Sequence, residues 1–211
     1  MKKVFLGGVI LTSLLLSACG NTKSTQANSS NESATASASQ SRKIIKVGQE
    51  IYYPTRGNLK FLVDSNKHIA EDTDGVNYKI LSTRLFRDKT KTSEQHNFLT
   101  QAFGNDIGST IYYVQVVYSL QNNTGHPIFI WGASGINESG TQYDSNNGAY
   151  DSLQSKTIQP DAKMNGTFLY KATSSDKDNF DKEKMVTGLV DIKSGDKDIK
   201  TIDHTTIDLT N

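Results

Sequence analysis

Beyond residue 42, apolar and polar positions alternate in short runs along most of the chain. The clearest run covers residues 110–121, where one face collects Tyr112, Val114, Val116, Tyr118 and Leu120. Alternation with period two, rich in β-branched and aromatic side chains, is typical of a β-strand. We therefore expect a central strand here. Asn and Gly at 122–125 favour a turn, and residues 127–131 are predicted to form the partner strand.

The remaining predicted strands are bounded by clusters of Gly, Asn, Asp and Ser, which favour turns. They cover residues 43–47, 50–53, 59–63, 76–87, 153–158, 164–172, 185–192 and 199–209. Many strands with turn signals between them indicate a sandwich or a barrel. Because the strands and the joining loops differ in length, we predict an all-β antiparallel sandwich.

One short helix is predicted within this β pattern. Ser93 is placed to cap a helix over residues 94–103, and Gly104 is placed to end it. Its apolar side chains share one side at helical spacing: Phe98, Leu99, Ala102 and Phe103. A helix of this length needs to pack on the sheet to be stable. A second short turn is predicted over residues 176–184, with Phe180 to bury.

The amino terminus has the layout of a secretory signal, a basic start followed by an apolar run and small residues. Lys2 and Lys3 precede an apolar run over residues 4–16, about thirteen residues, which is shorter than the ~20 that span a bilayer. The run ends in Leu-Ser-Ala-Cys-Gly at 16–20, which resembles the lipobox of bacterial lipoproteins. The resemblance implies cleavage before Cys19 and a diacylglyceryl thioether on its sulfur. The alternative is an ordinary signal peptide with a chance cysteine.

This organisation predicts three parts: a lipoprotein signal peptide at 1–18, a lipidated Cys19 with a flexible linker at 19–42, and a folded domain at 43–211. Residues 21–41 are almost entirely Ser, Thr, Asn, Ala, Gln and Glu. Such a segment buries too little apolar surface to offset its conformational entropy, so we expect it to be disordered. The membrane, reached through lipid on Cys19, is then the first expected partner. We expect the protein on the extracytoplasmic face of the cell membrane, as on a Gram-positive surface.

The charge balance limits the other partners. Lys2 and Lys3 are two of the 23 basic residues, so cleavage leaves 21 basic against 22 acidic residues and a net charge of −1. A nearly neutral chain gives no electrostatic reason to expect nucleic-acid binding. Cys19 is the single cysteine, so the mature chain has no disulfide and its fold must rest on core packing.

The segment around the central strand also resembles a known family. Residues 112–127, an alternating strand that ends in Asn-Asn-Thr-Gly-His-Pro, are similar to a recurrent core of telokin-like, immunoglobulin-like domains in secreted bacterial lipoproteins. Ile-Gln-Pro at 158–160 and Gly-Thr-Phe-Leu-Tyr at 166–170 look like the later strand pair of that family. The resemblance implies an Ig-like β-sandwich without a known catalytic centre. Two departures are the long stretch at 64–104 and Pro160-Asp161 in place of the usual proline–glycine pair.

A search for catalytic or cofactor chemistry finds no motif. None of the four histidines, His68, His96, His126 and His204, belongs to a nucleophile pattern, and no glycine-rich phosphate loop is present. The carboxylate-rich segments 71–75 and 176–183 could offer oxygen ligands to calcium, but neither has EF-hand spacing. We therefore interpret both segments as solvated loops. We predict no enzyme activity, no cofactor and no metal.

The best candidate for recognition is the long segment at 132–152, rich in Gly, Ser and Asn, which carries Tyr143 and Tyr150 and follows Trp131. Loops on a rigid sandwich often carry binding sites, and aromatic residues are efficient contact groups. In the alternative interpretation Trp131 is buried and the segment is mobile or holds a short hairpin. The sequence thus favours a non-catalytic binding or structural module for a protein or cell-wall polymer. A small-ligand carrier, or a hydrolase of cell-wall or host polymer, remains the alternative.

Overall fold

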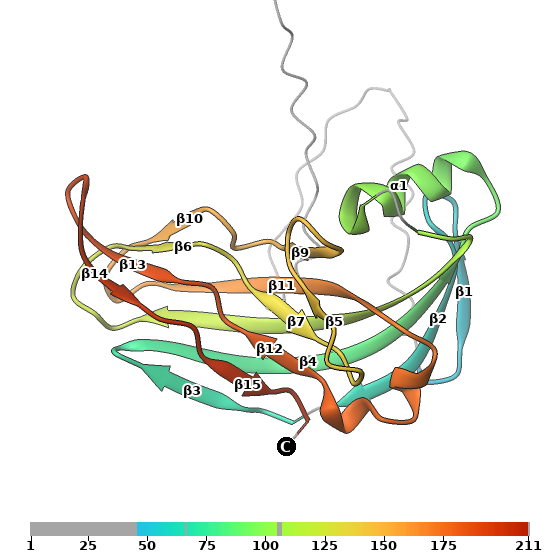
Figure 1. Cartoon of the computed structure of the whole chain (residues 1–211), viewed down its shortest axis with the longest axis horizontal. Coiled ribbons are helices and arrows are strands. Elements are labelled where there is room, and N and C mark those ends of the chain that lie inside the picture. The colour runs from blue at the N-terminus through green and yellow to red at the C-terminus, as the bar shows by residue number, and fades with distance from the viewer. Residues whose placement is uncertain (1–45, 66, 105–106, 211) are drawn as a thin grey trace, which may run out of the picture. The chain divides into compact units, whose positions relative to one another are not determined.

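The computed structural model describes residues 46–65, 67–104 and 107–210. Lys43–Asn211 form one compact unit. The predicted signal peptide, Cys19 and the linker lie outside the described residues. The folded unit is an antiparallel all-β sandwich with one α-helix (Figure 1).

The first layer is a seven-stranded sheet of order β1-β2-β4-β5-β11-β9, with β3 paired to β4. Its centre is formed by three long strands that pair along almost their whole length. The strands are β1 (Glu50–Tyr53), β2 (Gly57–Ser65), β3 (Ala70–Thr73), β4 (Val76–Lys89), β5 (Thr110–Asn122), β9 (Ala149–Asp151) and β11 (Lys163–Ala172).

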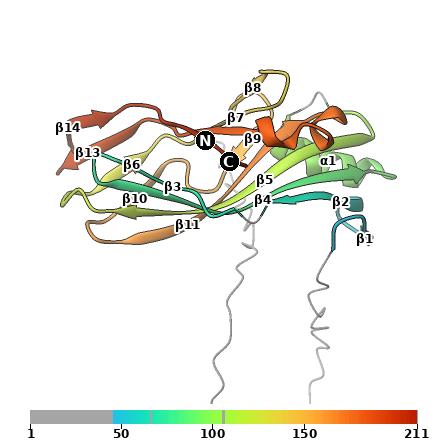
Figure 2. The same cartoon turned by 90° about the horizontal axis from the view of Figure 1, so that it is seen from below.

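The second layer consists of two four-stranded sheets, of order β10-β6-β13-β14 and β15-β12-β7-β8. Three of its chain segments pass from one sheet directly into the other, so the two sheets lie in succession across the first layer (Figure 2). The strands are β6 (Ile128–Ile130), β7 (Ser134–Ile136), β8 (Gln142–Tyr143), β10 (Lys156–Ile158), β12 (Lys184–Val186), β13 (Val190–Ser194), β14 (Lys197–Ile202) and β15 (Thr206–Asp208).

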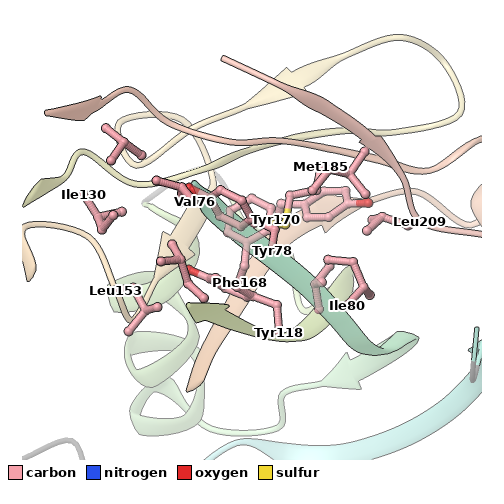
Figure 3. Packing of buried hydrophobic residues seen from close by; sticks show 14 of the residues in the cluster. Val76, Tyr78, Ile80, Tyr118, Ile130, Leu153, Phe168, Tyr170, Met185 and Leu209 are labelled. Atoms are coloured by element: carbon pink, nitrogen blue, oxygen red, sulfur yellow. The ribbon is translucent and has the colours of Figure 1, made fainter. Parts of the chain in front are cut away.

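The main core fills the space between the layers (Figure 3). β4, β5 and β11 bury their inward side chains against residues of the second layer, such as Ile130 and Met185. A bulge in β4 between Ile80 and Ser82 reverses its alternation, so that Leu85 points inward as Ile80 does. The layers approach closely at Gly135, where an added Cβ would lie 2.2 Å from Cγ of Tyr170.

A smaller outer core lies on the other face of the first sheet. There α1 (Ser93–Phe103) buries Leu99 and Phe103 against Phe86 and Tyr113. Thr92 is the N-cap, because its side chain accepts a hydrogen bond from the backbone N–H of Gln95 at 3.2 Å. Gly104 ends the helix with φ +82°. Two 3₁₀ turns, η1 (Ser175–Lys177) and η2 (Phe180–Lys182), follow β11.

The predicted sandwich with one short helix is confirmed, and so is the short turn that buries Phe180. Several details were wrong. The strand at 127–131 does not pair with β5: β6 lies in the other layer between β10 and β13. Within the predicted strand at 43–47, the described residues 46–47 form a turn, in which Gln49 N–H donates to Lys46 O. The N-cap is Thr92 in place of Ser93, and Phe98 is 40% exposed.

Candidate functional site

The second layer is interrupted where its two sheets meet. Residues 131–133 and 187–189 run past each other there outside any strand, joined by a hydrogen bond from Trp131 N–H to Leu189 O at 3.1 Å. An added Cβ at Gly188 would lie 1.6 Å from Gly132 O, so a side chain cannot be placed there without moving the backbone. Gly132 itself has φ +106°, which favours glycine. Both glycines line a depression of about 200 Å³.

Trp131 forms one side of the depression and is 55% exposed. Its indole Nε1–H donates to Asp191 Oδ2 at 2.6 Å. The other oxygen of Asp191 accepts from Thr201 Oγ1 at 2.8 Å, which fixes the carboxylate. The ring of Phe129 packs against the indole edge to face, with centroids 5.2 Å apart. The indole is therefore held in one orientation although more than half of its surface faces solvent.

Polar side chains surround the rest of the depression. Asp144 accepts backbone N–H groups of residues 146 and 147 through Oδ1, and the contacts of the described residues give its Oδ2 no donor. Gln154 donates through Nε2 to Ser145 Oγ at 3.2 Å, which leaves its Oε1 oxygen for other contacts. The His204 ring lies with Nδ1 2.7 Å from Thr187 O. Because a carbonyl only accepts, Nδ1 carries a proton, and in the neutral ring Nε2 is an acceptor.

The structure separates the residues that the sequence grouped as a recognition loop. Trp131 lines the depression together with residues 132–134 and 144–145 of that segment. Tyr143 in β8 pairs with Gly135 and packs against the main core, and Tyr150 in β9 pairs with Leu169; neither lines the depression. The alternative of a buried Trp131 was wrong. The short hairpin expected in the same alternative is present as β7–β8.

Sequence reasoning missed five residues of this site: Gln154, Gly188, Leu189, Asp191 and His204. They come from other segments of the chain, and only the pairing of the second layer brings them beside Trp131. The one signal that could have drawn attention to the break was the glycine at 188, inside what was predicted as a single strand over 185–192. An isolated glycine in a strand pattern indicates close backbone approach.

The two carboxylate-rich segments have structural roles. Residues 71–75 form β3 and its turn into β4, where Asp72 Oδ1 accepts from Gly75 N–H and Asp74 pairs with Lys200 at 2.9 Å. In the second segment, Asp176 and Glu183 are fully buried. Within the described ranges there is no group of three or more His, Cys, Asp or Glu side chains that could hold a metal ion.

Glu183 lies in the main core beside Tyr170, whose hydroxyl donates to Glu183 Oε2 at 2.6 Å. Thr173 donates to Asp176 Oδ2 through its hydroxyl at 3.1 Å and through its backbone N–H. Asp176 Oδ1 and Glu183 Oε1 are buried without a donor among the described residues. Burial raises the pKa of Glu183 to about 8; the hydrogen bond from Tyr170 opposes this rise, and the charge of Asp176 adds to it.

Another buried carboxylate, Asp88, lies beside the outer core. Arg56 donates to Asp88 Oδ2 through Nη2 at 2.6 Å and through Nε at 2.9 Å. The same guanidinium donates to the hydroxyl of Tyr113. Burial raises the pKa of Asp88, and the positive charge of Arg56 opposes that rise.

The four imidazole rings do not form a catalytic pair with a carboxylate in the part of the chain that is described. His68 and His126 are exposed, and His96 Nε2 lies 2.8 Å from Ile107 O. His204 contacts a backbone carbonyl, as above. The depression of about 200 Å³ is also smaller than the 300–1,000 Å³ of typical small-ligand sites.

No helix among residues 46–210, so far as they are described, is long and apolar enough to cross a membrane. No protein-family model matches the chain, and no curated protein matches it. A crystal structure of a functionally unknown protein from Listeria monocytogenes EGD-e is similar at a TM-score of 0.42 and 10% sequence identity, over 61% of this chain and 73% of that one. A similarity at this level carries no argument about fold or function.

Proposed function

We propose that the protein is a lipid-anchored, extracytoplasmic binding module without catalytic activity, and that it contacts its partner through the depression at Trp131. The observation that carries the proposal is that the indole of Trp131 is both exposed and held in one orientation. A tryptophan that is 55% exposed yet fixed by Asp191 and Phe129 offers a large apolar contact surface that loses little freedom on binding.

The surrounding architecture supports this role. Ala133, which lines the depression, also packs against the main core. Gly132 and Gly188 contribute only backbone to the lining. Open to solvent and small in volume, the depression suits one unit of an extended polymer or one side chain of a protein better than an enclosed small molecule.

The lipid anchor rests on the pattern at 16–20. Two or more acyl chains hold a protein stably on a bilayer, because each buried CH₂ group contributes ~0.8 kcal/mol. We expect the chain expressed in a Gram-positive host to fractionate with membranes and its mature amino-terminal peptide to begin with a diacylglyceryl Cys19. Cys19→Ala is expected to stop both processing and lipidation. A mature protein with a free thiol in the medium would contradict the anchor.

The binding role is tested with residues 43–211, which form one compact unit. We expect this domain to sediment with purified cell envelopes, and Trp131→Ala to weaken binding at least about tenfold, the loss of ~1.4 kcal/mol. Phe98→Ala is the matched control, because Phe98 is also an exposed aromatic residue but lies on α1. Equal binding by wild type, Trp131→Ala and Phe98→Ala would exclude the site. Absence of any envelope binding would contradict the proposed role.

A further inference from the structure

We infer that the ligand of the Trp131 depression is a neutral sugar residue of a glycan. This inference rests on the proposed function and names the chemical class of its partner. It follows from three features of the described residues: an exposed indole, a set of hydrogen-bond acceptors around the depression, and the absence of Lys and Arg from its lining.

The indole suits the apolar side of a pyranose ring. Its π face carries partial negative charge, and the C–H groups on one side of a pyranose carry partial positive charge, so the two surfaces attract each other. The contact requires a ring that presents a flat surface to solvent and does not rotate. Trp131 meets this requirement, because Asp191 holds Nε1–H and Phe129 supports the ring.

The acceptors suit sugar hydroxyl groups. Each hydroxyl must donate one hydrogen bond and can accept others. Asp144 Oδ2 and Gln154 Oε1 are acceptors around the depression, and His204 Nε2 is a third when its ring is neutral. Ser145 Oγ can exchange its contact with Gln154 for one with a hydroxyl. A ligand that combines an apolar ring face with several hydroxyl donors therefore matches both the indole and these acceptors.

The charges indicate that the sugar is neutral. No Lys or Arg belongs to the described lining, and Asp144 contributes a carboxylate. The nearby Lys193 lies over the Phe129 ring and pairs with Asp198, away from the lining. A phosphodiester or uronic acid would meet the Asp144 charge without a compensating cation, which disfavours anionic polymers.

The size agrees with a single ring. A depression of about 200 Å³ is smaller than the 300–1,000 Å³ of sites that enclose a whole small molecule, so it suits one ring of a longer glycan. Because the depression is open, the glycan can continue out of it in either direction.

The experiment uses the intrinsic fluorescence of residues 43–211, since Trp131 is the single tryptophan and reports on the site directly. The probes are the neutral disaccharides cellobiose, chitobiose, mannobiose and galactobiose, with glucuronic acid and a glycerol phosphate oligomer as anionic counterparts. We expect a saturable spectral change at millimolar concentrations with at least one neutral disaccharide, and none with the anionic probes.

Variants then test whether the side chain of Gln154 contacts the sugar. Gln154→Ala is expected to weaken the response at least about tenfold, whereas Phe98→Ala leaves it unchanged. Circular dichroism of each variant shows whether it is folded; should Gln154→Ala fail to fold, Gln154→Met, which keeps the length of the side chain but removes its amide, serves in its place. A response only to the anionic probes, or no response to any neutral disaccharide, would overturn the inference.

The two proposals fail in different ways. If Trp131→Ala abolishes envelope binding but no neutral disaccharide competes with it, the binding module stands and the sugar assignment is wrong. If envelope binding does not depend on Trp131, the site itself is wrong and both proposals fall. Competition by one of the disaccharides, with loss in Trp131→Ala, supports both.

Discussion

The two cores each hold a buried carboxylate beside a tyrosine, but they neutralise it in different ways. In the outer core, Asp88 is paired with the guanidinium of Arg56, which also contacts Tyr113. In the main core, Glu183 accepts from Tyr170 but faces a second buried carboxylate, Asp176. Burial raises the pKa of both residues; a cation opposes the rise at Asp88, and an anion increases it at Glu183.

The comparison teaches that similar burial leads to opposite protonation states. With Arg56 in contact, Asp88 keeps its charge as half of an ion pair. Glu183 has no such partner among the described residues, and its pKa of about 8 makes the protonated form dominant at neutral pH. A protonated Glu183 can donate to Asp176, so one proton then supplies both carboxylates with the hydrogen bond they lack.

The largest expected effect comes from breaking the ion pair. Arg56→Met keeps the length of the side chain but leaves Asp88 buried and uncompensated, which should lower the free energy of unfolding by about 3–5 kcal/mol. Urea denaturation of residues 43–211 measures this. Arg84→Met is the control, because the Arg84–Asp64 pair at 3.1 Å is partly exposed and worth at most about 1 kcal/mol. Equal losses in the two variants would contradict the role given to Asp88.

The next effect is a dependence of stability on pH. The folded state holds the proton of Glu183 up to about pH 8, whereas the unfolded state releases it near the ordinary value of 4.5. The stabilisation is therefore complete below pH 4.5 and is lost as the pH rises towards 8. Glu183→Gln keeps a neutral donor at this position, so its denaturation midpoint should fall less than that of the wild type over the same pH window. If the midpoints of the two proteins change in parallel with pH, Glu183 is ionised in the folded state throughout this window.

A smaller loss of stability is expected when the hydroxyl of Tyr170 is removed. Tyr170→Phe takes one donor from Glu183 and should cost about 1–3 kcal/mol, as for other buried groups left without a partner. Tyr118→Phe sharpens the comparison: Tyr118 donates to Asp151 at 2.8 Å, but Asp151 also accepts two backbone N–H groups, of Leu153 and Ala133, whereas Glu183 accepts one, of Glu138. The free energy of unfolding should therefore fall less in Tyr118→Phe than in Tyr170→Phe. The opposite order in thermal denaturation would contradict this view of Glu183.

Long alternating runs made most of the fold predictable. The predicted strands at 76–87, 110–121 and 164–172 correspond to β4, β5 and β11 within one or two residues at each end. Four short strands, β3, β7, β8 and β9, were missed, because two to four positions rarely show a period; β1, also of four residues, was predicted with its exact bounds. For β3 a signal existed: Asp74-Gly75, both with positive φ, is a two-residue hairpin turn before β4.

The pairing of β6 was not readable from the sequence, because it depends on one buried side chain. Asn122 Nδ2 lies within hydrogen-bonding distance of the carbonyl oxygens of His126, Ile158 and Gln159. These contacts hold the segment after β5 against β10, so the chain crosses to the second layer without forming a hairpin. The same limit applies to the candidate site, where Asp191 and His204 reach Trp131 only through the pairing of distant strands.

β4 and β5 are shared by both cores, and this has a consequence for how the domain loses its structure. β4 places Leu85 in the main core and the next residue, Phe86, in the outer core, and β5 does the same with Val114 and Tyr113. Loss of the register between these two strands would disrupt both cores at once. Despite its two separate apolar clusters, the domain should therefore denature in a single cooperative transition, with fluorescence and circular dichroism tracing the same curve.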